Sequence, residues 1–450
     1  MRVLIVSPHF PPVNAPDHQR VRMALPLFEE FGWEPTVLAV NPAQVEGFHD
    51  PFLAQTISSD VRVVWTEALP AKWTRKLGVG SLAYRAGRHL KHAGEKLLNL
   101  EQFDLIFFST TVFPIMAFGP IWRKKFSVPY VLDFQDPWRS DYYKKHTGQR
   151  PPGGRFKYGF AQWRAGRLEP PAVRNAAHIV CVSPEYPKMF QRRYPELRDD
   201  QFTTIPFGAA EADYDLLRAT PVRQNIFDPR DGMRHWVYVG RGGADMGTSL
   251  RSFFGALNIV LKAKPEFRKE LKIHFVGTSY ASKGRAIKTV EPLAVEAGLA
   301  DMVSEQTDRI PYFEALQCLL DADALFIPGS NDPGYTASKL YPYILARKPL
   351  LAVFHEASSV VDILNKTKAG TVVTFRNDES TEDISERILK SGWLAGQNSE
   401  VKGQKSEVGG QRLVVVPPAT DWAAFAPYTA REMTRRLCEV FDKAANKIRK

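Results

Sequence analysis

Short apolar runs alternate with segments of helical periodicity along almost the whole chain, and this alternation constrains the fold more than any other feature. It is typical of a parallel sheet whose strands are joined by crossover helices. The alternation weakens once, over residues 203–229, where Pro, Asp and Arg are frequent, and then restarts. We therefore expect an α/β protein with two successive, doubly wound, Rossmann-like parallel sheets.

The apolar runs give the expected strands and domains. In the first half strands are expected at residues 3–6, 36–40, 61–65, 104–109, 130–133 and 178–182, and in the second half at 236–239, 273–276, 324–327, 350–353 and 371–375. The expected domains are residues 1–210 and 233–415, joined by a linker over 211–232. Residues 416–450 should contain a closing helix that packs back toward the first domain.

Composition and charge narrow the functional classes. A net charge of +11 favours acidic partners, but no nucleic-acid reader motif is present, so nucleic acid is not expected as a partner. The three cysteines lie far apart and form no CxxC pair, which indicates neither disulfides nor zinc and fits the reducing cytoplasm. No apolar segment reaches the roughly 18 residues that span a bilayer. Membrane contact should be peripheral, at the inner face of the cytoplasmic membrane.

One stretch, residues 72–98, concentrates the positive charge. Seven Lys or Arg lie between Lys72 and Lys96 against one acid, Glu95, while Leu82, Ala86, Leu90, Ala93 and Leu97 recur at helical spacing. This pattern predicts a basic amphipathic helix. Two interpretations stay open: an ordinary helix with a solvated basic face, or a helix that faces an anionic membrane surface.

Three polar, glycine-bearing loops follow strands of the second half. They contain Gly240, Arg241, Gly242 and Gly243; Gly277 and Thr278; and Ser330, Asp332, Gly334, Ser338 and Lys339. Ligands of open α/β sheets bind beyond the carboxyl ends of the strands, so these loops should meet in one crevice. Glycines and a helix N-terminus suit an anion, and the fork of Arg241 suits a diphosphate. Ser338 and Lys339 should take the distal phosphate, although a tight turn and a solvated lysine are the simpler interpretations.

The first half offers candidates for an acceptor. Asp136 follows a strand and is a candidate base or hydrogen-bond acceptor, while Trp138 and Arg139 are candidates for sugar contact. Asn14 and Arg20, in the loop after the first strand, are candidates for a phosphorylated acceptor. The alternatives are an Asp-Pro turn and a Pro-rich loop capped by Asp17.

Two further motifs are set aside as structural. Asp321-Ala-Asp323 spells a DxD sequence but should mark a helix-to-strand boundary, and His9 and His355 show no metal-ligand spacing.

The motifs together resemble the family 4 (group 1) glycosyltransferases, which have the GT-B fold. The resemblance rests on YVGR (238–241), IHFVG (273–277), the segments 310–330 and 338–352, Phe10-Pro-Pro, FDLIFFS (103–109), YVLDFQDPW (130–138), and AAHIVCVS (176–183) before IPFG (205–208). It implies two domains facing across a cleft. It also implies that Arg241 binds phosphate.

The sequence departs from the family pattern at three places. Met246-Gly247 stands where the family has Lys-Gly, so Lys339 is the candidate second cation. Gly334 and Pro342 stand at the positions of the family's two glutamates, and Asp332 is the nearest carboxylate that could contact the sugar. The usual Gly-Gly pair after the first strand is replaced by the Pro-rich loop that holds Asn14 and Arg20.

The resemblance implies a metal-independent glycosyltransferase that moves a sugar from a UDP- or GDP-sugar to a hydroxyl of a glycan or lipid-linked acceptor, with retention, in cell-surface polysaccharide or glycolipid synthesis. No cofactor beyond the nucleotide-sugar is expected, and no metal site. Arg241, Lys339 and Asp136 are the predicted catalytic residues. The alternatives are a non-hydrolysing nucleotide-sugar epimerase and an inactive binding protein with the same fold.

Overall fold

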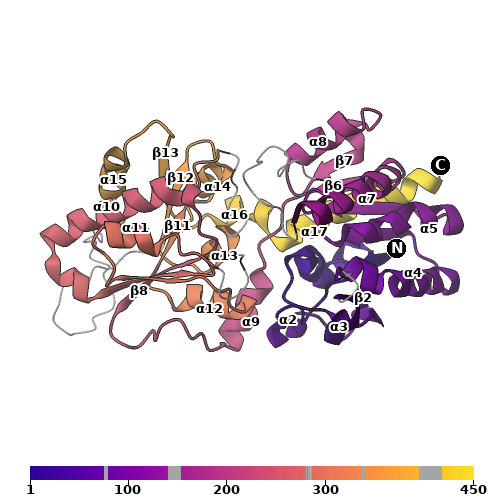
Figure 1. The fold of residues 1–450 in the computed structure, drawn as a ribbon, viewed down its shortest axis with the longest axis horizontal. Helices are drawn as coiled ribbons and strands as arrows, with labels where there is room; N and C mark the ends of the chain where they lie inside the picture. Colours follow the sequence, from indigo (N-terminus) through magenta and orange to yellow (C-terminus); the bar gives the residue numbers. More distant parts are fainter. Residues whose placement is uncertain are drawn as a thin grey trace. The chain divides into compact units, whose positions relative to one another are not determined.

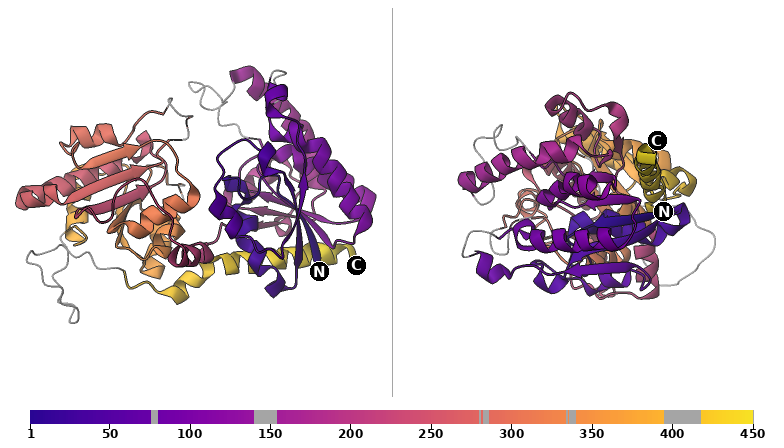
Figure 2. Two further views of the ribbon diagram at one scale, coloured as in Figure 1. Left: turned by 90° about the horizontal axis from the view of Figure 1, so that it is seen from below. Right: turned by 90° about the vertical axis from the view of Figure 1, so that its right-hand side faces the viewer.

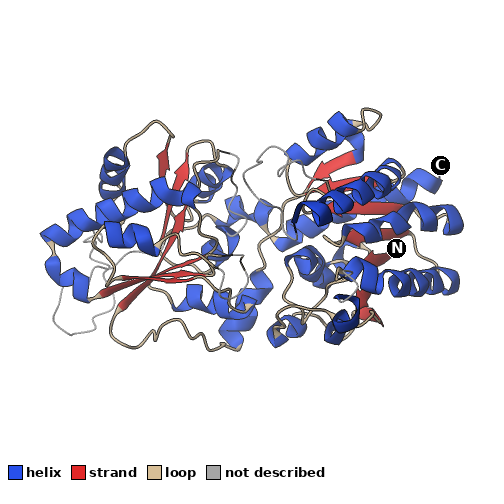
Figure 3. Cartoon of the chain, in the orientation of Figure 1, coloured by secondary structure: helices blue, strands red, loops and turns tan. Residues whose placement is uncertain are grey.

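The chain forms two compact α/β units, as Figures 1 and 3 show. The computed structural model describes residues 1–75, 80–139, 154–279, 281, 286–333, 335, 340–394 and 418–449. Unit 1 comprises Met1–Gly208 and Tyr428–Lys450, and unit 2 comprises Ala209–Pro427. Unit 1 is therefore discontinuous in sequence.

Unit 1 is built on a seven-stranded sheet in which every neighbouring pair is parallel. The strands are β1 (Arg2–Val6), β2 (Glu34–Val40), β3 (Arg62–Thr66), β4 (Leu105–Ser109), β5 (Tyr130–Phe134), β6 (His178–Cys181) and β7 (Phe202–Thr204). Their order is β3-β2-β1-β4-β5-β6-β7, so the strand order reverses between β1 and β4. We call this the switch point of unit 1, the place where open α/β sheets form a ligand crevice.

Successive side chains of a strand point to opposite faces of the sheet, and the central strands are apolar at successive positions. Both faces are therefore apolar, and both are covered by helices. They are α1 (Gln19–Ala24), α2 (Pro51–Gln55), α3 (Ala71–Thr74), α4 (Leu82–Leu100), α5 (Phe118–Phe126), α7 (Gly154–Arg174), α8 (Glu185–Arg193) and α17 (Ala430–Arg449). On one face Leu4 of β1 joins a core with Leu90 of α4. On the other face Ile5 joins a core with Leu437 and Phe441 of α17, the C-terminal helix that lies along unit 1 in Figure 2.

Unit 2 repeats the design with six parallel strands. These are β8 (Arg234–Val239), β9 (Leu271–Val276), β10 (Val303–Gln306), β11 (Ala324–Pro328), β12 (Leu350–His355) and β13 (Thr371–Phe375), in the order β10-β9-β8-β11-β12-β13. The helices are α9 (Glu211–Ala219), α10 (Gly247–Ala263), α11 (Glu291–Glu296), α12 (Tyr312–Asp321), α13 (Leu340–Leu345), α14 (Ser359–Thr367), α15 (Thr381–Lys390) and α16 (Trp422–Phe425). The switch point of unit 2 lies between β8 and β11.

The prediction of two doubly wound parallel sheets is confirmed, with two differences in detail. Strands β7 and β10 were not predicted, because β7 has only three residues and β10 alternates buried and exposed positions at the sheet edge. The predicted linker, residues 211–232, belongs instead to unit 2 and begins with α9. The sequence Asp321-Ala-Asp323 lies between α12 and β11, at the boundary expected for it.

A fully buried arginine of unit 1 forms hydrogen bonds to two strands that are not neighbours in the sheet or to the loops that follow them. Arg20 of α1 is 0% exposed, and its Nε donates to Oδ2 of Asp133 in β5 over 2.9 Å. Its guanidinium also donates to the carbonyl oxygen of Ile205, just after β7, over 2.6 Å. The prediction that Arg20 receives a phosphorylated acceptor is therefore wrong, because its charge is enclosed and paired inside the unit.

Replacing Arg20 by alanine should lower the free energy of unfolding by about 3–5 kcal/mol, because Asp133 then becomes a buried charge without its cation. Urea denaturation of the full chain measures this change. Arg198→Ala is the matched control: Arg198 pairs with Asp200 at the surface, where both side chains are exposed, and its loss should cost at most about 0.5 kcal/mol. Equal effects of the two changes would contradict the structural role of Arg20.

Candidate functional site

The three glycine-bearing loops of unit 2 meet at its switch point, as predicted from the strand ends. The N–H of Gly242, after β8, donates to the carbonyl oxygen of Thr278, after β9, over 2.7 Å. The N–H of Asn331, after β11, donates to the carbonyl oxygen of Asp245 over 2.8 Å. Backbone hydrogen bonds therefore hold these loops together.

Arg241 is a cationic residue of this loop cluster. Its two terminal nitrogens donate to the two carboxylate oxygens of Asp245 over 3.0 and 2.7 Å. Its guanidinium also lies 4.6 Å from the ring centre of Tyr335. The hydrogen bond from Arg241 lowers the pKa of Asp245, although partial burial opposes this shift. Asp245 was not predicted from the sequence. Its position four residues after Arg241, at a spacing that allows an ion pair, was the feature that could have indicated it.

The glycines of the first loop are explained by contacts within the chain. A side chain at Gly240 would collide with the Tyr238 hydroxyl, and one at Gly243 would collide with the side chains of Arg241 and Asp245. The N–H of Gly240 donates to the carbonyl oxygen of Val276 over 2.9 Å. Since the Gly242 N–H is also engaged, the prediction that these two amides bind a phosphate is not supported.

The second loop forms a hydrogen bond to a buried carboxylate, that of Glu305. The hydroxyl of Thr278 donates to Glu305 over 2.6 Å, and Glu305 also accepts the N–H groups of Thr289, Val290 and Glu291 at the start of α11. Gly277 has φ +71°, a left-handed conformation that glycine adopts without strain. Both residues therefore stabilise the conformation of this loop. The Thr278 hydroxyl, which was predicted to contact the nucleotide-sugar, is hydrogen-bonded to Glu305 instead.

The third loop is only partly described. Ser330 is buried, its Oγ accepts the N–H of Asp332 over 3.1 Å, and its hydroxyl contributes to the lowered pKa of Asp245. Gly334, Ser338 and Lys339 lie outside the described residues. The predicted second cation, Lys339, therefore stays a prediction.

In unit 1 the switch point is occupied by a buried carboxylate, that of Asp17. Asp17 follows β1 and accepts hydrogen bonds from the hydroxyl of Thr110 and the N–H of Thr111, both after β4, over 3.0 Å each. It also accepts a hydrogen bond of 2.9 Å from Nδ1 of His9. Burial alone would raise the pKa of Asp17, but His9 and the Thr111 N–H together lower it to about 2. Asp17 therefore stays ionised at neutral pH.

The predicted acceptor residues fall into different environments. Trp138 is only 9% exposed and stacks on Phe113 with ring centres 5.8 Å apart, so it belongs to the core and not to a sugar-binding surface. Arg139 lies 3.9 Å from the buried Glu169. Asp136 is exposed, and partial burial of its carboxyl together with the charge of Asp17 raises its pKa. Asn14 is half-buried. Of these four residues only Asp136 is exposed.

The predicted basic helix is α4, and its apolar face packs inward. Leu82, Ala86, Leu90 and Leu97 are all buried in the core of unit 1. Arg85 is buried as well, and its Nε donates to the carbonyl oxygen of Leu69 over 2.8 Å. The interpretation of an ordinary helix is therefore correct for the apolar side, while the exposed side still carries basic residues such as Arg88 and Lys96.

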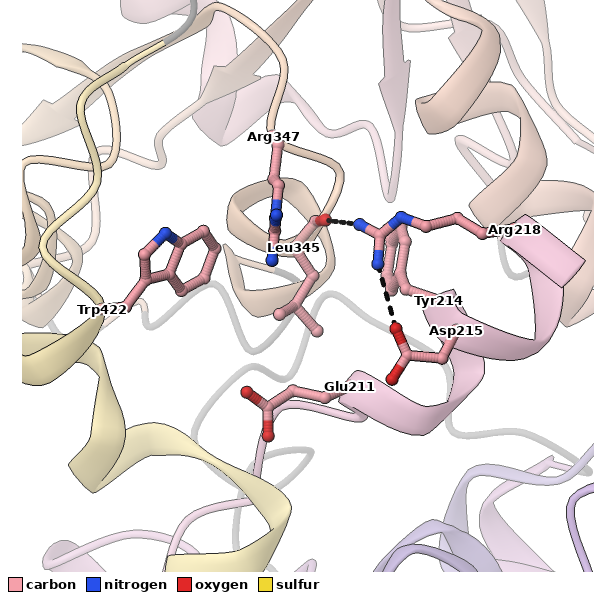
Figure 4. A pocket seen from close by; sticks show the side chains of 7 residues that line it. All are labelled: Glu211, Tyr214, Asp215, Arg218, Leu345, Arg347 and Trp422. Carbon is pink, nitrogen blue, oxygen red and sulfur yellow. Dashed lines mark hydrogen bonds and ion pairs between the residues drawn. The ribbon is translucent and has the colours of Figure 1, made fainter.

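A separate hollow of about 250 Å³ lies in unit 2 among α9, α13 and α16 (Figure 4). It is lined by Glu211, Tyr214, Asp215, Arg218, Leu345, Arg347 and Trp422. Arg218 donates to Asp215 over 3.2 Å and to the carbonyl oxygen of Leu345 over 3.1 Å. Arg347 lies 4.7 Å from the ring centre of Trp422. Both cations are thus engaged within the unit, and the hollow contains none of the predicted site residues.

No three His, Cys, Asp or Glu side chains in the described part of the chain lie close enough together to hold a metal ion. No described helix is both long and apolar enough to cross a membrane.

The chain is similar to known proteins in one region of its sequence and in its fold. Residues 18–208 match the family model described as a glycosyl transferase 4-like domain. HepE from Anabaena, solved in complex with UDP, is 15% identical with a TM-score of 0.55, and the match covers 98% of this chain and 100% of that chain. A glycosyltransferase from Rickettsia africae is 12% identical with a TM-score of 0.53, covering 98% of both chains. No curated protein matches the sequence.

The chain therefore has the GT-B fold of these solved structures. The match to the glycosyl transferase 4-like domain lies within unit 1. The resemblance noted from the motifs is thereby confirmed for the fold and for this domain. At 12–15% identity the solved structures establish the fold alone.

Two buried histidines should make stability depend on pH. Burial lowers the pKa of His18 to about 4, helped by the charge of Arg22, and burial lowers the pKa of His274 to about 4 as well. An unfolded histidine titrates near 6.5, so the unfolded chain binds more protons between pH 6.5 and 4, and stability falls as the pH falls through that window.

Each of these histidines should cost about 2 kcal/mol of stability between pH 7 and pH 5. Denaturant titrations at several pH values measure this slope. His18→Gln keeps a donor for the carbonyl oxygen of Val13 but cannot titrate, so it should flatten part of the slope. The exposed His92→Gln should leave the slope unchanged. A slope that His18→Gln does not alter would show that folding does not lower the pKa of His18.

Proposed function

We propose that this protein transfers a glycosyl unit from a nucleoside diphosphate sugar to a hydroxyl of a glycan or lipid-linked acceptor, in cell-surface polysaccharide or glycolipid synthesis. A UDP-sugar is the favoured donor, because HepE has been solved with UDP and with UDP-glucose. Retention of the anomeric configuration follows from the family resemblance. The observation that carries the proposal is the fork of Arg241 at the switch point of unit 2.

The proposed donor site is electrostatic. Arg241 is about one quarter exposed, so its fork lies at the surface of the loop cluster, where a ligand has access to it. The 17-residue helix α10 begins at Gly247, and the positive end of its dipole favours an anion beside the same loop. A diphosphate carries more negative charge than the Asp245 carboxylate and competes with it for the same N–H groups.

Positive charge at this position would stabilise the leaving diphosphate, the group on which negative charge develops during transfer. Arg241 and the α10 N-terminus would supply it, with Lys339 as the candidate third contribution, so we propose that no divalent metal is required. On the acceptor side we propose that Asp136 accepts a hydrogen bond from the acceptor hydroxyl. Its exposure beyond the carboxyl end of β5 supports this role.

Loss of the Arg241 side chain should abolish donor binding. Thermal-shift measurements with UDP-, GDP-, ADP- and dTDP-sugars identify the donor, since a ligand at 100 times its dissociation constant adds about 2.7 kcal/mol of stability. Arg241→Ala should remove the shift, while Asp136→Ala should keep it and lose transfer. Arg268→Ala, which removes an exposed arginine paired with Asp301, is the control and should keep both.

Three outcomes would overturn this assignment. A normal donor shift in Arg241→Ala would refute the phosphate contact. An isomerised donor formed without any acceptor would instead indicate an epimerase. Donor binding without turnover in a membrane extract would indicate an inactive binding protein.

We further propose that unit 1 contacts an anionic membrane surface, such as the cytoplasmic leaflet. The first half of α7 exposes Phe156, Phe160 and Trp163 at helical spacing, and Phe156 is 90% exposed. The rings of Phe160 and Trp163 stack with centres 5.7 Å apart, and the guanidinium of Arg167 lies 3.9 Å from the centre of the Trp163 ring. Exposed aromatic rings beside basic side chains are typical of helices at a membrane interface.

This aromatic face adjoins the basic helix α4. The guanidinium of Arg164, on α7, lies 4.0 Å from the centre of the exposed Tyr84 ring, on α4. The two helices therefore place aromatic rings and the basic side of α4, with Arg88 and Lys96, on neighbouring parts of unit 1. Such a surface is suited to a lipid-linked acceptor held at the bilayer.

Removing the two stacked rings should weaken vesicle binding. Phe160→Ser with Trp163→Ser should lower partitioning onto phosphatidylserine-containing vesicles about tenfold or more, because each ring contributes roughly 1.5–3 kcal/mol when buried. Added salt should weaken binding of both proteins. Val295→Ser, which removes an exposed apolar side chain of unit 2, is the control. Unchanged binding of the double variant in a sedimentation assay would refute this surface.

A further inference from the structure

The hollow of unit 2 drawn in Figure 4 holds side chains that still have hydrogen-bonding capacity. The carboxylate of Glu211, at the start of α9, accepts no hydrogen bond from any described residue. The guanidinium of Arg347, after α13, lies over the ring of Trp422, but none of its N–H groups donates within the described part of the chain. The indole N–H of Trp422 has no acceptor there either. An acceptor and two donors from three separate segments therefore surround one space.

The backbone of Arg347 supports a role for its side chain. Its φ is +56°, in the left-handed region, and its N–H donates to the carbonyl oxygen of Ile344 over 3.1 Å at the end of α13. Glycine usually occupies this position after a helix, because a Cβ is strained there. The chain keeps an arginine in spite of that strain. Backbone strain of this kind is concentrated at functional positions.

The charges around the hollow favour a ligand that bears hydroxyl groups. Arg218 is paired with Asp215 over 3.2 Å, which leaves Glu211 and Arg347 for a ligand. Partial burial and the charge of Asp215 raise the pKa of Glu211, while the charge of Arg347 lowers it, so both charged groups lie close to Glu211. A phosphate would be repelled by the carboxylates, and an amine by the arginines. A hydroxyl can donate to Glu211 and also accept from Arg347.

The size and the apolar wall of the hollow fit a single sugar ring. Its volume of about 250 Å³ is below the roughly 300–1,000 Å³ of sites for drug-sized ligands. Leu345 and the indole of Trp422, which is 37% exposed, line it. The C–H face of a pyranose packs on such apolar surfaces. Its hydroxyls on adjacent carbons match the paired oxygens of a carboxylate and the paired N–H groups of a guanidinium.

We propose that the hollow is a carbohydrate site that binds one pyranose ring, either a free sugar or a unit of a glycan. Glu211 accepts hydrogen bonds from ring hydroxyls, Arg347 donates to ring oxygens, and Trp422 with Leu345 contacts the C–H face. The site lies within unit 2 and contains no residue of the proposed donor site. It is therefore independent of the proposed function.

Saturation-transfer NMR titrations of the full chain test this proposal. The probes are the methyl α-glycosides of glucose, galactose, mannose and N-acetylglucosamine, of which at least one should bind. Glu211→Gln should weaken that binding about tenfold or more, because hydrogen bonds to a charged group are lost. Glu266→Gln, which changes an exposed glutamate outside the hollow, is the matched control and should bind normally. Arg241→Ala should also bind normally, which separates this site from the donor site.

Arg347→Gly removes the side chain together with the backbone strain. It should abolish sugar binding while the thermal midpoint stays equal to that of the wild type or rises. Ser127→Gly, at the left-handed position after α5 of unit 1, is the control: it should not lower the midpoint, and it should keep binding. The trisaccharide of the preferred sugar should bind more tightly than the methyl glycoside if the ligand is a glycan, and equally if it is a free sugar.

Three results would overturn the proposal. The first is that no methyl glycoside binds. The second is that Glu211→Gln and Arg347→Gly both bind the preferred glycoside as the wild type does. The third is binding of L-leucine, a zwitterion, in place of any glycoside. None of these results would alter the thermal shift caused by a nucleotide-sugar, so the proposed function is tested separately.

Discussion

An aspartate that bridges two diverging loops organises each half of this protein. At the switch point of a doubly wound sheet, the loops that follow two neighbouring strands lead to helices on opposite faces of the sheet. These loops therefore separate, and the hydrogen bonds between the strands do not extend to them. In unit 1 the Asp17 carboxylate spans this opening by accepting from Thr110 and Thr111. In unit 2 Asp245 does so with its backbone, through Asn331, while its side chain holds Arg241. The presentation of the candidate functional groups follows from these two anchors.

Most of the fold was predictable because it depends on local patterns. Eleven of the thirteen strands appear as apolar runs, and parallel strands bring their carboxyl-end loops to one edge whatever the loop sequence. The two missed strands are those that apolarity does not reveal: the three residues of β7 and the edge strand β10, where Ser304 faces outward between Val303 and Glu305. The convergence of the glycine loops was correct for the same topological reason.

Side-chain roles were less predictable because they depend on partners distant in sequence. Arg20 was expected to face a ligand, but its partner Asp133 lies 113 residues away and encloses it. Trp138 likewise lies against Phe113 in the core. His9 was set aside as a solitary histidine, although Asp17 stands eight residues later in the same loop. A search for carboxylates near each loop histidine, instead of for metal spacing alone, would have identified this pair.

The discontinuity of unit 1 has a consequence for how the protein is made. The helix α17 completes one face of the unit 1 sheet, where Leu437 and Phe441 pack against Ile5 and Phe107. During synthesis these residues leave the ribosome only after all of unit 2 has been translated. Until α17 has been synthesised, one apolar face of the sheet formed by residues 1–208 stays exposed to solvent. Chaperones would be expected to bind this exposed face. The last twenty or so residues act as the closing step of folding for the half that was synthesised first.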